Sequence, residues 1–416
     1  MRSTSSARLG GHRRAAAAGP APTRAGRPGR RIRPVPVAAL LAAVLLAAGC
    51  SSTSANAGGA ATSDPMAGMN MTTTMPAQLP PAATPTSVNV YSHDGANALS
   101  PNVAGQRQLV YVPNSDQNSV DVIDPTTFKV IDHYVTGKNP QHVVPAWDLK
   151  TLYVTNDLAN SLTPVDPTTG KPKGPNIPVD DPYNMYFTPD GKYAIVVAEA
   201  RERLDFYDAQ TWQLVHQVHV DCPGVDHIDY SADESFLVAT CEFSGKLVKI
   251  DWKTFQVLGY LTIGGMPQDI KLDPQGEVFY VADMQSNGVH LIDAKTFTKI
   301  GFMPTGKGAH GLYPSRDAKV LYVSNRGEGS ISLIDFATRR IVGRWQIPGG
   351  GSPDMGGVSA DGSVLWLSGR YNREVYAIST ADGHLLARIP VGAGPHGMSV
   401  WPQPGRYSLG HTGILR

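Results

Sequence analysis

The sequence predicts an all-β fold, a seven-bladed β-propeller of four-stranded antiparallel blades that extends over residues 88–416. Two periodic features predict it. An apolar, strand-like phrase recurs seven times, and a second strand that ends in an acidic residue follows it, at intervals of 42 to 44 residues. The phrases are LVYVPN (109–114), TLYVTN (151–156), YAIVVA (193–198), FLVATC (236–241), VFYVAD (278–283), VLYVSN (320–325) and VLWLSG (364–369). The strand-ending residues are Asp124, Asp166, Asp208, Asp251, Asp293 and Asp335, with Ser379 in the seventh copy.

The recurring acidic residue has a physical role in each repeat. A threonine follows it three residues later in six copies, as Thr127 follows Asp124. An aspartate side chain accepts hydrogen bonds from the backbone just after it and so closes a turn between strands. A third strand follows the turn, and we expect a fourth to begin near Pro140, Pro182, Val225, Pro267, Ala309, Pro353 and Pro395. Four short strands in each of seven repeats predict a propeller, whose small sheets bury their faces against one another.

The ends of the repeat region predict how the ring closes. The strand 110–114 begins a blade that has no inner strand before it. The segment 396–401 resembles an inner strand, yet no outer strands follow it. We therefore expect the C-terminal strand to complete the first blade and to lock the ring.

The repeat resembles the YVTN-type β-propeller family of bacterial extracytoplasmic proteins. The resemblance rests on the phrase TLYVTN, the Asp-x-x-Thr turn, a following Pro-x-Gly and a Pro-Asp-Gly turn such as 189–191, and it covers about residues 105–402. It implies the fold and the compartment. It does not imply one activity, because propellers of this kind host unrelated functions.

The N-terminus has the features of an export signal. Residues 1–49 combine an Arg-rich start with an apolar run from Val35 to Gly49, which is too short for a comfortable transmembrane helix. The run ends in Leu-Ala-Ala-Gly-Cys, which resembles a lipoprotein signal box with Cys50 as the lipidated residue. An ordinary secretory signal or an uncleaved anchor is the alternative. Pairs of arginines occur at residues 13–14 and 30–31. The sequence leaves open whether export uses the general secretory or the twin-arginine route.

A polar segment separates the signal from the propeller. Residues 50–87 are rich in Ser, Thr, Ala and Pro and nearly uncharged, which predicts a flexible tether to the outer face of the membrane. Four methionines gather in this tether, and thioethers are soft ligands that favour Cu(I). They are Met66, Met69, Met71 and Met75.

Composition excludes several classes of function. A net charge of +1 with 17% charged residues gives no basic footprint for nucleic acid. The sequence has no Cys-x-x-Cys-His for covalent haem and no phosphate-binding loop for a nucleotide. The chain has three cysteines, too few for a disulfide scaffold or a zinc ribbon.

One face of the propeller gathers the polar residues that could bind a ligand. The start of each inner strand and the end of each second strand meet on that face, the channel rim. Carboxylates concentrate in blades 2 to 5 and arginines in blades 6 and 7, so we expect an acidic wall opposite a basic wall. The candidate rim residues are His142, Glu199, Asp226, His227, Glu242, Asp269, His310, Arg326, Asp354, Arg370 and His396.

Blade 4 holds the densest group. Asp226, His227 and Glu242 combine imidazole with carboxylates, which suits zinc, copper, iron or manganese. The alternative is a set of polar channel residues satisfied by water and by one another. Cys222 and Cys241 map to the same blade, and in an oxidising compartment they predict a disulfide. Metal ligation beside His227, or two free thiols, are the other interpretations.

Three functions remain open. The sequence favours a monomeric, membrane-anchored, non-catalytic module that binds an unidentified protein or small molecule at the rim. A copper-type metal-handling protein is the second. The third is a hydrolase, because some propellers with a similar repeat are lactonases. That resemblance would assign the chemistry to channel residues of this kind, here Glu199, Glu242, Arg326 and His310.

Overall fold

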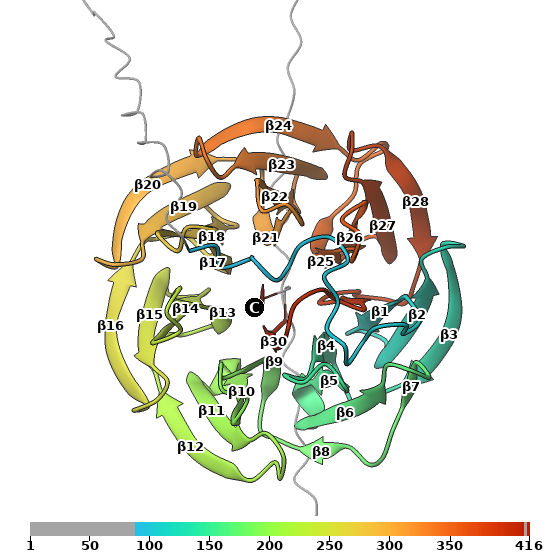
Figure 1. The fold of residues 1–416 in the computed structure, drawn as a ribbon, viewed down its shortest axis with the longest axis horizontal. Helices are drawn as coiled ribbons and strands as arrows, with labels where there is room; N and C mark the ends of the chain where they lie inside the picture. The colour runs from blue at the N-terminus through green and yellow to red at the C-terminus, as the bar shows by residue number, and fades with distance from the viewer. Residues whose placement is uncertain (1–87, 412–413) are drawn as a thin grey trace, which may run out of the picture. The chain divides into compact units, whose positions relative to one another are not determined.

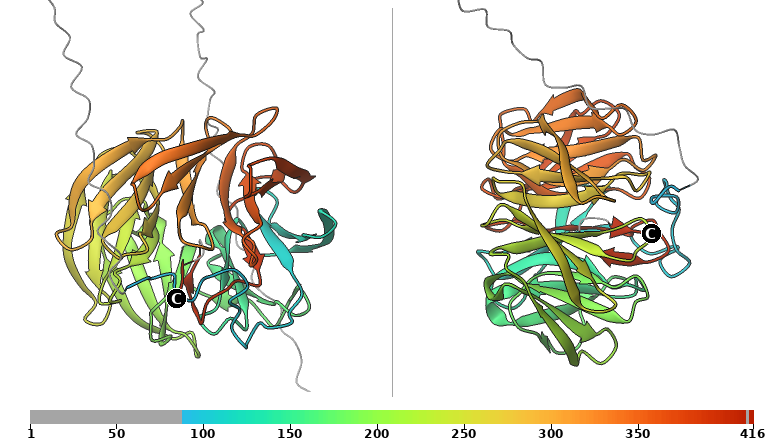
Figure 2. Two further views of the ribbon diagram at one scale, coloured as in Figure 1. Left: turned by 45° about the horizontal axis from the view of Figure 1, so that its top comes forward. Right: turned by 90° about the vertical axis from the view of Figure 1, so that its left-hand side faces the viewer.

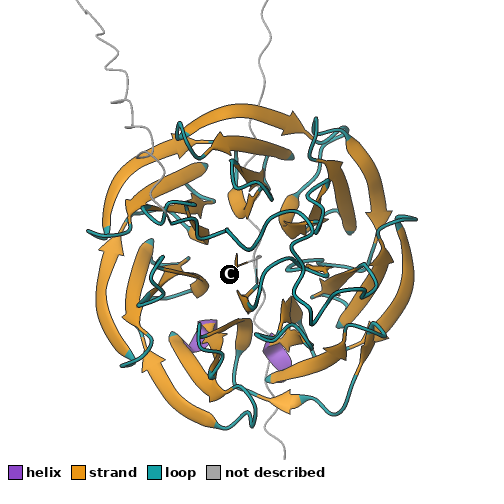
Figure 3. Cartoon of the chain, viewed as in Figure 1, coloured by secondary structure: helices purple, strands orange, loops and turns teal. Residues whose placement is uncertain are grey.

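The computed structural model describes residues 88–411 and 414–416. Seven antiparallel sheets surround a central channel, as Figure 1 shows, and Figure 3 shows that nearly all regular structure is strand. The predicted seven-bladed propeller is thereby confirmed. Two single-turn 3₁₀ helices follow second strands, η1 (Asp157–Ala159) and η2 (Glu199–Arg201). Within the described residues, no helix has the length and apolar character needed to cross a bilayer.

Every blade uses the same strand order from the channel outwards. Blade 1 contains β29 (Ser399–Trp401), β1 (Leu109–Asn114), β2 (Ser119–Asp124) and β3 (Lys129–Val135). Blade 2 contains β4 (Pro140–Pro145), β5 (Leu152–Asn156), β6 (Ser161–Asp166), β7 (Lys171–Pro172) and β8 (Ile177–Pro178), both of the last two paired with β6. Blade 3 contains β9 (Pro182–Phe187), β10 (Tyr193–Ala198), β11 (Arg203–Asp208) and β12 (Leu214–His219). Blade 4 contains β13 (Val225–Tyr230), β14 (Leu237–Cys241), β15 (Lys246–Asp251) and β16 (Gln256–Thr262).

The remaining three blades follow the same plan. Blade 5 contains β17 (Pro267–Leu272), β18 (Val278–Asp283), β19 (Gly288–Asp293) and β20 (Thr298–Pro304). Blade 6 contains β21 (Ala309–Pro314), β22 (Val320–Asn325), β23 (Ser330–Asp335) and β24 (Arg340–Gln346). Blade 7 contains β25 (Pro353–Val358), β26 (Val364–Gly369), β27 (Glu374–Ser379) and β28 (Leu385–Pro390). Six inner strands begin at the predicted residue.

The repeated acidic residue closes a turn as expected. Asp124 Oδ1 accepts the backbone N–H of Thr126 at 2.9 Å, and Asp293 Oδ1 accepts the N–H of Thr296 at 2.7 Å. In the seventh copy Ser379 Oγ takes this role and accepts the N–H of Ala381 at 3.3 Å. These bonds close the turn between the third and fourth strands of a blade, counted from the channel, without using the strand ladder.

An asparagine ends the repeated phrase in three of the seven copies, and it ties the second strand of its blade to the third. Asn156 Nδ2 donates to Thr163 Oγ1 at 2.9 Å, and Asn325 Nδ2 donates to Ser332 Oγ at 3.0 Å. Both asparagines are fully buried. A buried polar group needs such a partner, and these bonds supply it.

The C-terminal strand completes blade 1, which confirms the predicted ring closure. Val400 pairs with Val110, and Trp401 pairs with Leu109. The regular strand begins at Ser399, three residues later than expected. The reason is that Gly397 instead bridges to His142 on the inner strand of blade 2.

The chain after the last repeat closes the far end of the channel. A hairpin of β30 (Ser408–Gly410) and β31 (Ile414–Leu415) pairs with β9 at Tyr186. The terminal Arg416 reaches Asp229 at 3.3 Å. Figure 2 shows this tail and the first described residues on one face of the disc. The rim, where the inner strands begin, is the opposite face.

Candidate functional site

Inner strands open with a β-bulge at the rim. In blades 2, 4, 5, 6 and 7 the pairing with the second strand skips two residues after the first pair. The skipped pairs are Gln141-His142, Asp226-His227, Gln268-Asp269, His310-Gly311 and Asp354-Met355. Bulges turn side chains out of the alternation of a regular strand. The bulges therefore explain why rim residues from distant parts of the sequence converge at the channel.

A hydroxyl group on the second strand supports the bulge. Thr155 Oγ1 accepts the backbone N–H of His142 at 3.0 Å, and Thr240 Oγ1 accepts that of His227 at 3.0 Å. In blade 6, Ser324 Oγ accepts the N–H of the residue after His310 at 2.8 Å. The bulged backbone is thus satisfied without the strand ladder, and the histidine side chains are free to face the channel.

Three side chains from three different blades bring their ligating atoms together. They are His310 in β21, Asp354 in β25 and His396 just before β29, and all are at most 3% exposed. One ligating atom of each lies within 4.8 Å of the other two. His310 Nδ1 is 3.1 Å from Asp354 Oδ1, and His396 Nε2 is 3.7 Å from Asp354 Oδ2. Among the described residues this is the set of His, Cys, Asp and Glu that meets such a spacing.

The tautomer of His396 is fixed by its neighbours. Gln141 Nε2 donates to Asn139 Oδ1 at 2.6 Å, so Gln141 Oε1 is left as an acceptor. His396 Nδ1 lies 2.9 Å from Gln141 Oε1 and must therefore carry the proton. The lone pair of His396 is then on Nε2, the atom that faces Asp354. Metal-binding histidines are commonly oriented through their second ring nitrogen in this way.

Two arginines form the basic wall next to these residues. Arg326 Nη1 donates to Asp354 Oδ1 at 3.1 Å, and its guanidinium lies 5.5 Å from the centre of the Tyr371 ring. Arg370 Nη1 donates to Ser115 Oγ at 3.2 Å. Because Arg326 occupies Oδ1, the remaining oxygen of Asp354, Oδ2, has no hydrogen-bond partner although it is buried.

Three further imidazoles lie at the channel centre. The ring of His142 is 4.8 Å from that of His396, 5.6 Å from that of His227 and 4.3 Å from that of His411. His142 and His227 are completely buried, and neither nitrogen of either ring has a hydrogen-bond partner. His227 Nδ1 lies 2.7 Å from Asp226 Oδ1 without the geometry of a hydrogen bond.

Burial keeps these histidines neutral. It lowers the pKa of His227 to about 4, and the pKa values of His142, His310 and His396 are held well below the usual range. For each group the largest cause is loss of solvation, and neighbouring positive groups such as Arg370 act in the same direction on the last three. A neutral imidazole offers a lone pair at neutral pH, which is the form that binds a metal.

The opposite wall carries Glu199 in blade 3 and Glu242 in blade 4, two of the carboxylates that the sequence assigned to blades 2 to 5. Burial, together with the charges of Asp226 and Glu242, raises the pKa of Glu199 to about 9. Burial, with the charge of Asp226, also raises the pKa of Glu242 to about 7. Burial, with the charges of these carboxylates and of Asp226, also raises the pKa of Tyr183. Like charges in a buried site hold protons more strongly, and a cation that bound there would displace them.

The blade-4 trio is not assembled in the same way. Asp226 and His227 are neighbours, but with Glu242 they do not form one of the sets whose ligating atoms converge within the described residues. Asp269 serves the backbone instead, because its oxygens accept the N–H groups of Ile270 and Leu312 at 2.9 Å each. The structure thus places the tightest ligand set in blades 6, 7 and 1, across the channel from blade 4.

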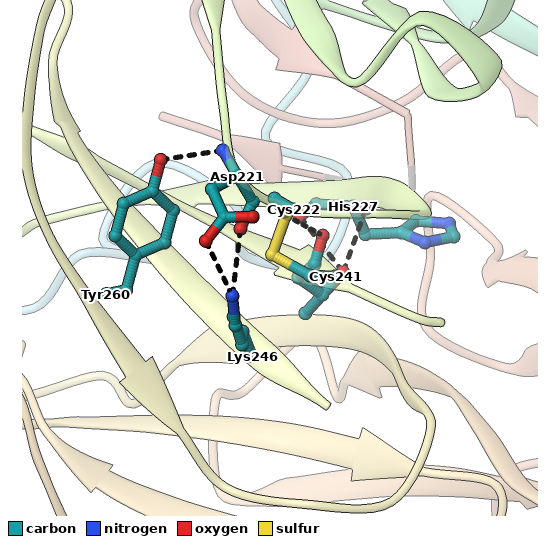
Figure 4. The surroundings of a disulfide bond; sticks show 7 residues. Asp221, Cys222, His227, Cys241, Lys246 and Tyr260 are labelled. Atoms are coloured by element: carbon teal, nitrogen blue, oxygen red, sulfur yellow. Dashed lines mark hydrogen bonds and ion pairs between the residues drawn. A yellow bond between two sulfur atoms is a disulfide. The ribbon is translucent and has the colours of Figure 1, made fainter. Parts of the chain in front are cut away.

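Cys222 and Cys241 form a disulfide within blade 4, with a Cα–Cα distance of 5.1 Å. Figure 4 shows the ring of His227 pointing away from the two sulfurs. Lys246 holds the loop before Cys222 through Asp221, at 2.8 Å. In this oxidised form the sulfurs are not thiolate ligands for a metal beside His227.

A family model for YNCE-like β-propellers matches residues 70–404. The chain belongs to the YNCE-like β-propeller family. This agrees with the resemblance to YVTN-type propellers found in the repeat. No curated protein matches the sequence.

Solved structures share the fold of this YNCE-like propeller at low identity. Hydrazine synthase of Kuenenia stuttgartiensis superposes with a TM-score of 0.59 at 20% identity, over 72% of this chain and 98% of that chain. Dihydro-heme d1 dehydrogenase NirN in complex with DHE gives 0.57 at 14%, over 77% and 83%. A putative 6-phosphogluconolactonase from Bacteroides uniformis gives 0.58 at 16%, over 71% and 99%. At these identities the likeness concerns the fold alone.

Sequence reasoning did not identify two of the residues that lie at this site, and several other predicted residues lie outside the part of the chain that the structure describes. His411 belongs to the tail, which has no repeat to predict its position, and Gln141 gave no chemical signal by itself. The predicted lipidation site Cys50 and the four tether methionines fall in residues 1–87, outside the described residues.

Proposed function

We propose that this YNCE-like propeller is a non-catalytic binding protein whose ligand is a transition metal ion, held at the rim by His310, Asp354 and His396. The observation that carries the proposal is the convergence of their ligating atoms within 4.8 Å in a buried site. A buried carboxylate oxygen without a hydrogen-bond partner, Asp354 Oδ2, calls for a cation or a water molecule.

The donor set indicates the class of metal. Two imidazoles and one carboxylate suit zinc, copper, iron or nickel better than calcium or magnesium, which prefer oxygen ligands. The hydrogen bond from His396 to Gln141 supplies the outer contact that orients a ligating histidine. Three protein ligands leave a position of the metal open, and the adjacent Arg326 and Arg370 favour an anionic group there.

We propose further that the protein works outside the cell, anchored through a lipid on Cys50. The signal-like leader and the small residues before Cys50 support this placement. Cys50→Ala should release the protein from the membrane fraction into the medium and abolish labelling by a radioactive fatty acid. Unchanged labelling of the variant would overturn the lipoprotein assignment.

The metal proposal is tested on the full chain with zinc. Zinc is chosen because thioethers of the tether bind it poorly, so tether methionines would not add to the count. After loading and exhaustive dialysis, we expect bound zinc that Asp354→Asn and His396→Ala each reduce by one equivalent per chain.

A matched control separates the site from general histidine binding. His219 is exposed on the outer strand β12, so His219→Ala should leave the zinc content unchanged. Circular dichroism and thermal unfolding must show that all variants fold. Equal zinc content in the parent, Asp354→Asn and His396→Ala would overturn the proposal.

A further inference from the structure

A second group of imidazoles lies deeper in the channel than the His310, Asp354 and His396 set. It consists of His142, His227 and His411, which come from β4, β13 and the tail after β30. All three are at most 2% exposed. We infer that these three histidines form a second transition-metal site, adjacent to the first.

The spacing of the rings fits ligation of one ion. A metal–nitrogen bond of about 2.0–2.1 Å places the centre of each ligating ring about 3.2 Å from the metal, so rings in tetrahedral or trigonal array lie about 5–5.5 Å apart. The observed distances between ring centres are 4.3, 5.6 and 6.3 Å, and their average is close to that spacing. The ligating nitrogens do not converge as those of the first set do, so binding of one ion requires the rings to rotate toward a common point.

The burial of unpartnered nitrogens is the second, independent observation. Both ring nitrogens of His142 and of His227 lack a hydrogen-bond partner, although the side chains are fully enclosed. Leaving a buried polar group unsatisfied costs about 1–3 kcal/mol, and native structures rarely retain several such groups together. A bound ion would give one nitrogen of each ring a partner.

An orienting contact and charged groups surround the three rings. The backbone N–H of His142 is held by Thr155 Oγ1 and that of His227 by Thr240 Oγ1, at 3.0 Å each. His411 also makes a hydrogen bond to the backbone of Val143, an outer contact of the kind that orients a ligating histidine. Asp226 lies beside His227, and Asp269 acts on charge there, so both would offset part of the ion's charge, whereas the buried Lys271 acts in the opposite direction on His227 and His411.

The two sites meet at His142 and His396, whose ring centres are 4.8 Å apart. An ion in one site would therefore raise the cost of an ion in the other. We expect two binding steps of different affinity, with the all-imidazole site filled independently of Asp354. The tail that closes the channel thus also contributes a ligand.

Zinc titration of the full chain tests this inference separately from the proposed function. The parent should bind two equivalents, His411→Ala one, Asp354→Asn one, and the double variant none. With Co²⁺ as a spectroscopic probe, the Asp354→Asn variant should retain the visible absorption of a nitrogen-ligated tetrahedral ion, and His411→Ala should lose that component. His219→Ala serves again as the control. If His411→Ala does not fold, His142→Gln replaces it.

The outcomes distinguish the two proposals. One equivalent in the parent that is lost in Asp354→Asn but kept in His411→Ala would overturn the second site and leave the first. One equivalent lost in His411→Ala and kept in Asp354→Asn would overturn the first and support the second. No zinc or cobalt in the parent would overturn both.

Discussion

Closure of the ring by the C-terminal strand predicts a large cost for Trp401→Ala. The Trp401 side chain is 1% exposed and packs in the core between blades 1 and 2, with Tyr111 and Leu152. Its indole N–H donates to Gln106 Oε1 at 2.8 Å. Truncation of a buried tryptophan to alanine costs about 3–5 kcal/mol, and loss of the hydrogen bond adds about 1 kcal/mol. We expect the free energy of unfolding to fall by about 4–6 kcal/mol.

Urea denaturation followed by tryptophan fluorescence and circular dichroism measures this loss. The matched control is Trp345→Ala, since Trp345 is half-buried on the outermost strand β24, with its ring tilted against that of Tyr322 and the ring centres 5.3 Å apart. It should cost less than half as much, with an unchanged dependence on urea. If Trp401→Ala shifts the midpoint no more than Trp345→Ala does, then the C-terminal strand does not hold the ring and the reasoning is refuted.

Three further predictions concern the channel and blade 4. Replacing Cys222 and Cys241 by serine opens a loop with a sequence separation of 19 residues, and chain entropy predicts a loss of about 3 kcal/mol in denaturant unfolding; no loss would show that the bridge does not constrain the unfolded chain. Since burial lowers the pKa of His227 to about 4, the unfolded chain binds more protons between pH 6.5 and 4. Metal-free protein should therefore lose up to roughly 3 kcal/mol as the pH falls through that window, and His227→Gln should flatten the slope. Gly397→Ala would place a Cβ 2.1 Å from Nδ1 of His142, so it should displace that ring and reduce bound zinc, whereas unchanged zinc would exclude a role for that ring.

The repeat predicted the strands and turns of the propeller because the residues that form them act on groups close to them in the sequence. An aspartate that closes a turn acts within three residues of itself, so Asp124 and its equivalents could be interpreted from sequence. The start of the inner strand at Pro140 or Pro353 likewise followed from spacing. Pairing between strands then assembles these local elements into blades, and the blades form the ring.

The site was harder to predict because it depends on distances across the channel. The sequence placed His310, Asp354 and His396 on one rim, but it placed eight other candidate residues on the same rim. Which of them converge is set by the rotation of each bulge and by the neighbours that orient each ring, as Gln141 orients His396. No periodic feature marks His411, because it follows the last repeat.

The residues of the repeat are therefore subject to two kinds of constraint. The acidic turn residue satisfies backbone groups within its own blade and recurs in six of the seven copies, as at Asp124 and Asp293. The two bulged residues at the start of an inner strand carry no such repeated role, and their identity differs from blade to blade. That freedom lets blades 6, 7 and 1 supply a carboxylate and two imidazoles while blade 5 turns Asp269 back to the backbone. We therefore expect a ligand site of this asymmetric kind among the residues that depart from the repeat. Its histidines, His310 and His396, are buried by the surrounding residues, and burial favours the neutral imidazole that binds a metal.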